Sequence, residues 1–191
     1  MKKNDFAVFV DRDGTINVDV DFLSSPEQLS LIPRSAEAIR ELNELHIPVI
    51  VITNQSGIAR GYFTEEDLQK IHHTLNEQLQ THHAFVTDYF YCPHYPPISE
   101  KQGKYFVECE CRKPKPGMLL QAQKKYHYNL QNSFLVGDKC MDIRAGKSVG
   151  AKSILVSTGY GKKEHPHCVN EIDFYATDLY DAVQYIKRWF K

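Results

Sequence analysis

The sequence has almost no net charge and no long hydrophobic run. Lysine and arginine number 23 against 24 aspartates and glutamates, and a formal charge of -1 supplies no overall field for binding nucleic acid or an anionic membrane. Near the N-terminus, charged residues return after a few apolar positions, too soon for a signal sequence or a membrane-spanning helix. We therefore expect a cytoplasmic protein that has no nucleic-acid or membrane partner.

Internal repeats, low-complexity tracts and linker-like changes of composition are also absent. The 191 residues, of which 42% are hydrophobic, suffice for one domain with a sizeable core, and we expect residues 1–191 to form that single domain. Cysteine is scarce. There are five, an odd number, and three of them lie within twenty residues, which favours metal or thiol chemistry over a frame of disulfides.

What the sequence does contain is an alternation of two kinds of segment. Five short β-rich runs are apolar at nearly every position, as expected of strands covered on both faces: residues 6–10, 47–53, 87–91, 133–137 and 153–157. Helical patterns lie between them and near the C-terminus, at residues 35–46, 64–80, 117–128, 140–150 and 178–190. This alternation predicts an α/β, Rossmann-like three-layer sandwich with a mainly parallel sheet. Residues 161–167 are predicted to form a solvated loop.

Polar and charged residues gather where three of the predicted strands end. Asp11 and Asp13 directly follow the first strand, and Arg112 and Lys113 precede a predicted helix. Because ligands of α/β sheets bind beyond the carboxyl ends of the strands, we expect these residues to lie close to others at strand ends: Gly14, Thr15, Thr53, Asn54, Gln55, Ser56, Gly57, Gly137, Asp138, Lys139 and Asp142. Carboxylates suit Mg²⁺, and a lysine suits the equatorial oxygens of a phosphoryl group.

These motifs resemble those of the haloacid dehalogenase superfamily of phosphohydrolases. DxDGT at residues 11–15, the pair Thr53 and Asn54, Lys113, and GDxxxD at residues 137–142 match in order over nearly the whole chain. The segments TNQSGIARGYF, CPHYP and CECRKPKPGM resemble the branch of D-glycero-D-manno-heptose 1,7-bisphosphate phosphatases. That resemblance implies removal of the 7-phosphate of the sugar bisphosphate, leaving heptose 1-phosphate, and no large cap domain.

Two other functions stay open. Histidinol-phosphate phosphatases and broader sugar phosphatases share the same four motifs. The second alternative is a zinc-stabilised binding module whose phosphatase residues are vestigial and no longer catalyse a reaction. Taken alone, DxDGT also suits an acidic turn or the start of a helix, although the three matching strand ends weigh against that interpretation.

A phosphatase mechanism gives the two first aspartates different roles. Asp11 would attack phosphorus to form an aspartyl-phosphate, which splits a slow hydrolysis into two easier steps. Asp13 would protonate the leaving oxygen and later activate water, which requires surroundings that raise its pKa. Alternation along a strand puts both side chains on one face, so we expect the chain to turn after Asp11, with Gly14 permitting the turn. Lys113 and Thr53 would stabilise the phosphoryl group.

The family resemblance also implies a magnesium site and a set of substrate contacts. Mg²⁺ would be held by the side chains of Asp11 and Asp138 and by the backbone carbonyl of Asp13, with Asp142 behind them. We expect a monomer acting on a small sugar bisphosphate. The resemblance places substrate contacts at Asp19, Val20, Asp21, Phe22, Thr53, Asn54, Gln55, Ser56, Arg112, Lys113 and Lys139.

A second group of residues suits zinc. Three thiolates and an imidazole complete a tetrahedral Zn²⁺ site with no open position, which is typical of structural zinc: Cys92, His94, Cys109 and Cys111. These residues flank fourteen others with little apolar content, so zinc would order the loop 92–111 and fix Arg112. The alternative is unliganded loop cysteines beside a surface histidine. We expect Cys140 and Cys168, which have no evident partner, to fill space or lie exposed.

Overall fold

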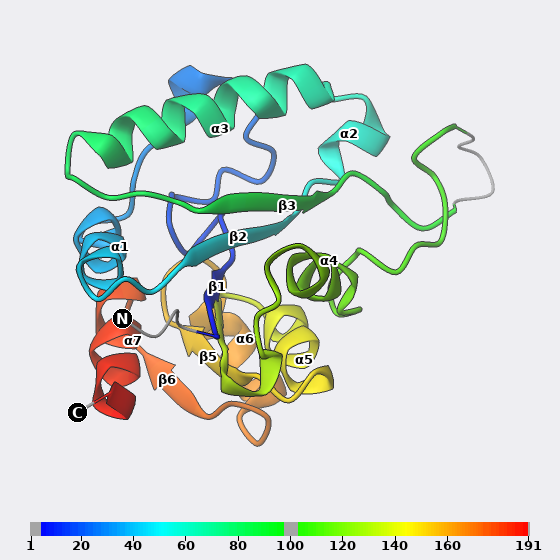
Figure 1. The fold of residues 1–191 in the computed structure, drawn as a ribbon. Helices are drawn as coiled ribbons and strands as arrows, with labels where there is room; N and C mark the ends of the chain where they lie inside the picture. The colour runs from blue at the N-terminus through cyan, green and yellow to red at the C-terminus, as the bar shows by residue number, and fades with distance from the viewer. Residues whose placement is uncertain (1–4, 98–102, 191) are drawn as a thin grey trace.

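The computed structural model describes residues 5–97 and 103–190, and a six-stranded sheet runs through its centre (Figure 1). The strand order is β3-β2-β1-β4-β5-β6, and every neighbouring pair is parallel. The strands are β1 (Val8–Val10), β2 (Val49–Asn54), β3 (Asp88–Cys92), β4 (Phe134–Gly137), β5 (Lys152–Val156) and β6 (Phe174–Ala176). The order reverses between β1 and β4, the place where α/β sheets bind ligands.

Helices cover both faces of this sheet (Figure 1). One face packs against α1 (Ser35–Glu44), α3 (Glu65–Gln80) and α7 (Leu179–Lys187). The other packs against α4 (Gly117–Tyr126), α5 (Cys140–Ser148) and α6 (Gly161–Cys168). The predicted three-layer α/β sandwich is confirmed, and the described residues form no large cap over it. Short elements complete the described chain: η1 (Pro26–Gln28), α2 (Gly57–Arg60), η2 (Leu130–Asn132) and η3 (Arg188–Phe190).

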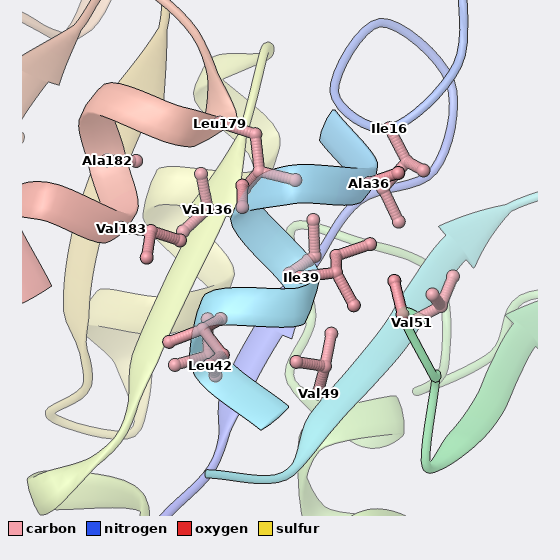
Figure 2. Close-up of a cluster of buried hydrophobic side chains, with 14 of the residues drawn as sticks. Ile16, Ala36, Ile39, Leu42, Val49, Val51, Val136, Leu179, Ala182 and Val183 are labelled. Carbon is pink, nitrogen blue, oxygen red and sulfur yellow. The ribbon is translucent and has the colours of Figure 1, made fainter. Parts of the chain in front are cut away.

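The core divides between the two faces because successive strand residues point in opposite directions. Val8 and Val10 of β1 pack on the α1 side, whereas Phe9 packs on the α4 side. Figure 2 shows Ile39 and Leu42 of α1 lying among the valines of β2 and β4 and the apolar residues of α7. Apolar burial on both faces explains why the strands were recognisable as continuous hydrophobic runs.

The predicted start of α3 is confirmed. The Thr64 side chain accepts a hydrogen bond from the Asp67 N–H, and the Asp67 carboxylate accepts one from the Thr64 N–H, each at 3.1 Å. This reciprocal cap satisfies two donors that the first turn leaves without a partner. Within residues 5–97 and 103–190, no helix is both long and apolar enough to cross a membrane.

The loop predicted for residues 161–167 is wrong, because α6 begins at Gly161 and includes Pro166. The Glu164 carboxylate accepts a hydrogen bond of 2.9 Å from the Cys140 N–H, which fastens α6 to the first turn of α5. A tertiary contact of this kind stabilises a helix whose own sequence is polar and contains proline. β6 was also not predicted, and it is a three-residue strand at the edge of the sheet.

The expectation that Cys140 and Cys168 have no partner is likewise wrong. They form a disulfide, and both residues are buried. The bond joins the first residue of α5 to the last residue of α6. Their separation of 28 residues carries no local signal of pairing, because only the packing of α6 beside α5 brings the two sulfurs together.

We predict that this disulfide contributes about 2–4 kcal/mol to the free energy of unfolding, as expected for closing a loop of this length. Cys168→Ala should therefore be less stable than the wild type in urea unfolding without reductant. In tris(carboxyethyl)phosphine the two proteins should become nearly equal, because the wild-type bond is then reduced. A wild-type midpoint that does not respond to the reductant would contradict the prediction.

Candidate active site

The ends of β1, β2 and β4 bring the predicted catalytic residues together. The Asp11 N–H donates to the Val136 carbonyl at 2.9 Å, so the nucleophile candidate leaves β1 while still paired with β4. Gly14 has a φ of 79°, which confirms the predicted turn after the strand. A Cβ at Gly14 would collide with the Asp138 carboxylate. Glycine therefore allows the first loop to lie directly against the end of β4.

Lys113 is buried between two carboxylates. Its Nζ lies 2.8 Å from Asp11 Oδ1 and 2.6 Å from Asp142 Oδ1, and it donates to the Ile52 carbonyl at 2.9 Å. The Asn54 side chain holds the Lys113 backbone, accepting from its N–H and donating to its carbonyl, both at 3.1 Å. Asn54 thus positions the lysine by way of its main chain, a role that the sequence did not reveal.

Burial governs the acidity of this group. Removal from water raises the pKa of Asp11 to about 6, although Lys113 opposes that shift. Burial alone would lower the pKa of Lys113, but Asp11 and Asp142 outweigh it and raise the pKa. The lysine is therefore a fixed positive charge directly beside the carboxylate that would attack phosphorus.

Asp138 completes an acidic cluster with Asp11 and Asp142, in which the ligand oxygens lie within 4.8 Å of one another. Asp138 Oδ2 accepts from the Tyr160 N–H at 2.8 Å, whereas Oδ1 is buried with no hydrogen-bond partner in the described chain. Burial and the two neighbouring carboxylates raise the pKa of Asp138 to about 8. When all three carboxylates are ionised, one contacting ammonium leaves two negative charges. The cluster therefore suits a divalent cation such as Mg²⁺, whose binding would displace the Asp138 proton.

Asp13 lies in different surroundings from those expected. Arg12, which is fully buried, reaches both oxygens of Asp13 at 2.8 and 3.0 Å, and Asn17 and Gln55 each donate to it at 2.9 Å. Burial alone would raise the pKa of Asp13, but the charge of Arg12 and these hydrogen bonds lower it. The expected increase in pKa is therefore wrong for the protein without substrate. The sequence showed Arg12 inside the motif, but not that its side chain turns back onto Asp13.

A cavity opens over Asp11 and Asp13. Val20 does not line it and is exposed, whereas Gly57 and Met141 line it without having been predicted to contact substrate. The other predicted binding residues all line this cavity: Asp19, Asp21, Phe22, Thr53, Asn54, Gln55, Ser56, Arg112, Lys113 and Lys139.

Lys139 and Tyr160 bind two carboxylates of the loop after β1. Lys139 Nζ lies 3.1 Å from Asp19 Oδ2, and Tyr160, whose ring Lys139 approaches, donates to Asp21 at 2.9 Å. The loop after β1 is thereby joined to the residue before α5 through Lys139 and to the residue before α6 through Tyr160. One wall of the cavity is therefore held together by charge.

The four predicted zinc ligands also converge. Cys92 Sγ lies 3.7 Å from His94 Nδ1, 3.6 Å from Cys109 Sγ and 3.1 Å from Cys111 Sγ, and His94 Nδ1 lies 3.2 Å from Cys111 Sγ. A tetrahedron with zinc–sulfur bonds of 2.3 Å has edges of about 3.7 Å, so the donor set has nearly the size that zinc requires. Cys92 is the last residue of β3, and Arg112 donates to the His94 carbonyl at 3.1 Å.

Comparisons with known proteins agree with this geometry. The family model described as HAD-hydrolase-like matches residues 110–182. The chain is 40% identical over 178 residues to D-glycero-beta-D-manno-heptose-1,7-bisphosphate 7-phosphatase of Pasteurella multocida, covering 90% of this chain and 94% of that protein. It is 40% identical over 158 residues to D-glycero-alpha-D-manno-heptose-1,7-bisphosphate 7-phosphatase of Photorhabdus laumondii, covering 82% and 85%.

A solved structure is also similar over nearly the whole chain. D,D-heptose 1,7-bisphosphate phosphatase from B. bronchiseptica, complexed with magnesium and phosphate, matches with a TM-score of 0.85 and 32% identity, over 96% of this chain and 98% of that one.

We predict that the pKa of Asp138 makes the magnesium-free protein less stable as pH rises from 6.5 to 8.5. The folded state retains the Asp138 proton up to about pH 8, while the unfolded state has lost it well below pH 6.5. The unfolding equilibrium constant should increase by at most about tenfold per pH unit.

Asp138→Asn is the matched control, because it lacks only this titration and retains the other groups that ionise in the same window. Urea unfolding at several pH values would measure both proteins. A wild type that loses no stability relative to the variant would contradict the prediction. Added Mg²⁺ should stabilise the wild type more at pH 8.5 than at pH 6.5, because it competes with the proton.

Proposed function

The chain belongs to the haloacid dehalogenase-like hydrolases, in the branch of the D-glycero-D-manno-heptose 1,7-bisphosphate phosphatases, and we propose that it removes the 7-phosphate of that bisphosphate to leave heptose 1-phosphate. The observation that carries the proposal is the contact of Asp11 with buried Lys113 at the floor of an open cavity. A carboxylate paired with a fixed cation can attack phosphorus while the cation binds the phosphoryl oxygens.

Mg²⁺ is the proposed metal at the acidic cluster. Asp11 and Asp138 would hold it by their side chains and Asp13 by its backbone carbonyl, while Asp142 stays with Lys113. The buried and unpaired Asp138 Oδ1 supports this assignment, as does the magnesium present in the similar solved structure. When bound, the ion supplies positive charge to the phosphoryl group.

Asp11 carries the substitution at phosphorus in this mechanism. Its oxygen attacks the 7-phosphate, the bond from phosphorus to the sugar oxygen breaks, and an aspartyl-phosphate forms. Water then attacks the phosphorus of this intermediate and releases inorganic phosphate. Lys113 and Thr53 bind phosphoryl oxygens in both steps, and Asn54 keeps Lys113 in place.

Asp13 moves the protons in both steps. It donates a proton to the sugar oxygen as that oxygen leaves, and then takes one from the attacking water. In the substrate-free protein the Arg12 contact keeps Asp13 ionised, the form that the second step requires. A phosphate dianion bound beside Asp13 repels its negative charge and raises its pKa, which allows the protonated form in the first step.

The zinc site is proposed to be structural. Cys92, His94, Cys109 and Cys111 fill four positions, which leaves none for an activated water. The metal would order the loop 92–111 and, through the hydrogen bond from Arg112 to the His94 carbonyl, fix one side of the cavity. We further propose that the protein acts in the cytoplasm as a monomer, on a diffusing sugar bisphosphate rather than on nucleic acid or membrane.

The proposed function is tested by phosphate release from both anomers of the heptose bisphosphate and from histidinol phosphate, with Mg²⁺ present. We expect one heptose anomer to be the preferred substrate. Asp11→Asn should retain its fold but lose nearly all turnover, because an amide is a poor nucleophile. Faster turnover of histidinol phosphate would instead indicate that alternative, and absence of release from the whole set would indicate a binding module. Substantial turnover by Asp11→Asn would remove Asp11 from its role.

Loss of the zinc site should impair recognition while leaving the magnesium requirement intact. Cys109→Ser is expected to bind less than one zinc per chain and to raise KM for the bisphosphate, since displacing a binding group by about 1 Å can cost on the order of 10²-fold. Cys168→Ala is the matched control, because it removes a cysteine outside the cluster and should retain zinc. Metal analysis and kinetics are measured on the same samples. Full activity without zinc, or activity with zinc in place of Mg²⁺, would overturn this assignment.

A further inference from the structure

Arg60 is a cation beside the cavity to which the proposed mechanism assigns no role. It ends α2, which begins at Gly57, a residue that lines the cavity. Among the described residues no carboxylate lies within 4 Å of its guanidinium, and no hydrogen bond from that group is formed to them. Its Nε is buried and has no partner among these residues, which is costly for a polar group.

The contacts that Arg60 does make leave its donors free. Its guanidinium lies 4.2 Å from the centre of the Tyr95 ring and 5.7 Å from the centre of the Phe22 ring. A cation–π contact uses none of the N–H donors, so the two terminal nitrogens of Arg60, unlike the buried Nε, can still donate to an oxyanion. The two aromatic rings therefore orient Arg60 without satisfying it.

A second guanidinium lies at the same tyrosine. Arg112 approaches the Tyr95 ring at 5.3 Å and lines the cavity, and one of its N–H groups donates to the His94 carbonyl. Two positive charges at one ring repel each other unless an anion lies close to both. The other cations of the site are already paired, because Arg12, Lys113 and Lys139 each contact a carboxylate.

We propose that Arg60 acts with Arg112 as the binding site for the phosphate that is not transferred, and that Arg60 makes the enzyme select a bisphosphate over a monophosphate. This inference rests on the proposed function. The transferred phosphate takes Lys113 and the acidic cluster at one end of the cavity. A sugar carrying a second phosphate at its far end brings two more negative charges, which Arg60 and Arg112 would neutralise through charge-assisted hydrogen bonds.

The test compares kcat/KM for heptose 1,7-bisphosphate with that for heptose 7-phosphate, which lacks only the second phosphate. Arg60→Ala should lower the ratio of these two values by about 10- to 100-fold, the effect expected on losing hydrogen bonds to a charged group. Arg60→Lys should recover part of the ratio, because it restores the charge but not the planar fork. Arg40→Ala, which removes an arginine far from the cavity on α1, should keep the wild-type ratio.

Binding is measured separately from turnover through inhibition by heptose 1-phosphate. Its inhibition constant should rise in Arg60→Ala by about as much as the ratio falls. Equal losses on both substrates, with reduced zinc content, would overturn the proposal and make Arg60 only a support for Tyr95 and the loop 92–111. Failure of the proposed function itself is distinguishable, because the wild type would then show no preference for the bisphosphate before any substitution is made.

Discussion

The buried ammonium of Lys113 is the interaction on which the rest of the site depends. Asp11 and Asp142 both lie within 2.8 Å of it, and without it these carboxylates would be buried beside Asp138 with no contacting cation. A buried charge without a partner costs several kcal/mol, so Lys113 stabilises the folded arrangement of these carboxylates. The position of this ammonium does not depend on the flexible lysine side chain alone. Asn54, at the end of β2, holds the main chain of Lys113, so the sheet itself places the cation.

The two aspartates of the first motif show how neighbouring groups acquire opposite properties. Asp11 is buried among other carboxylates, and its pKa rises to about 6 despite Lys113. Asp13 is surrounded by donors, with Arg12 the strongest, and its pKa falls. The turn at Gly14 makes this separation possible, because an extended strand would leave both side chains in the same surroundings. In the substrate-free protein these environments favour the ionised form of Asp13 over that of Asp11, the reverse of what attack by Asp11 and proton donation by Asp13 require. Bound Mg²⁺ and phosphate would have to reverse this order in the proposed mechanism.

Much of this arrangement could be predicted from the sequence, and the exceptions have a common cause. Strands buried on both faces leave continuous apolar runs, so their ends, and the motifs placed there, were correctly located. The helix α6, the Cys140–Cys168 disulfide and the Arg12 contact with Asp13 all depend on which elements pack side by side. Local sequence does not record such contacts. Asn54 illustrates the difference, since its place at the strand end was predicted but its bond to Lys113, 59 positions away, was not.

The cavity thus has two ends of different construction. At the catalytic end, Asp11 and Asp138 follow buried parallel strands, which are rigid because both faces are packed. At the other end, Phe22 and Arg112 line the cavity from loops, and Arg60, the last residue of a four-residue helix, lies against the rings of Phe22 and Tyr95. The anomers of a heptose 1,7-bisphosphate differ only at C1, far from the phosphorus that reacts. In the proposed binding mode the residues that contact the reacting phosphorus do not touch C1, so the choice of anomer would depend on the loop residues Phe22, Arg60 and Arg112.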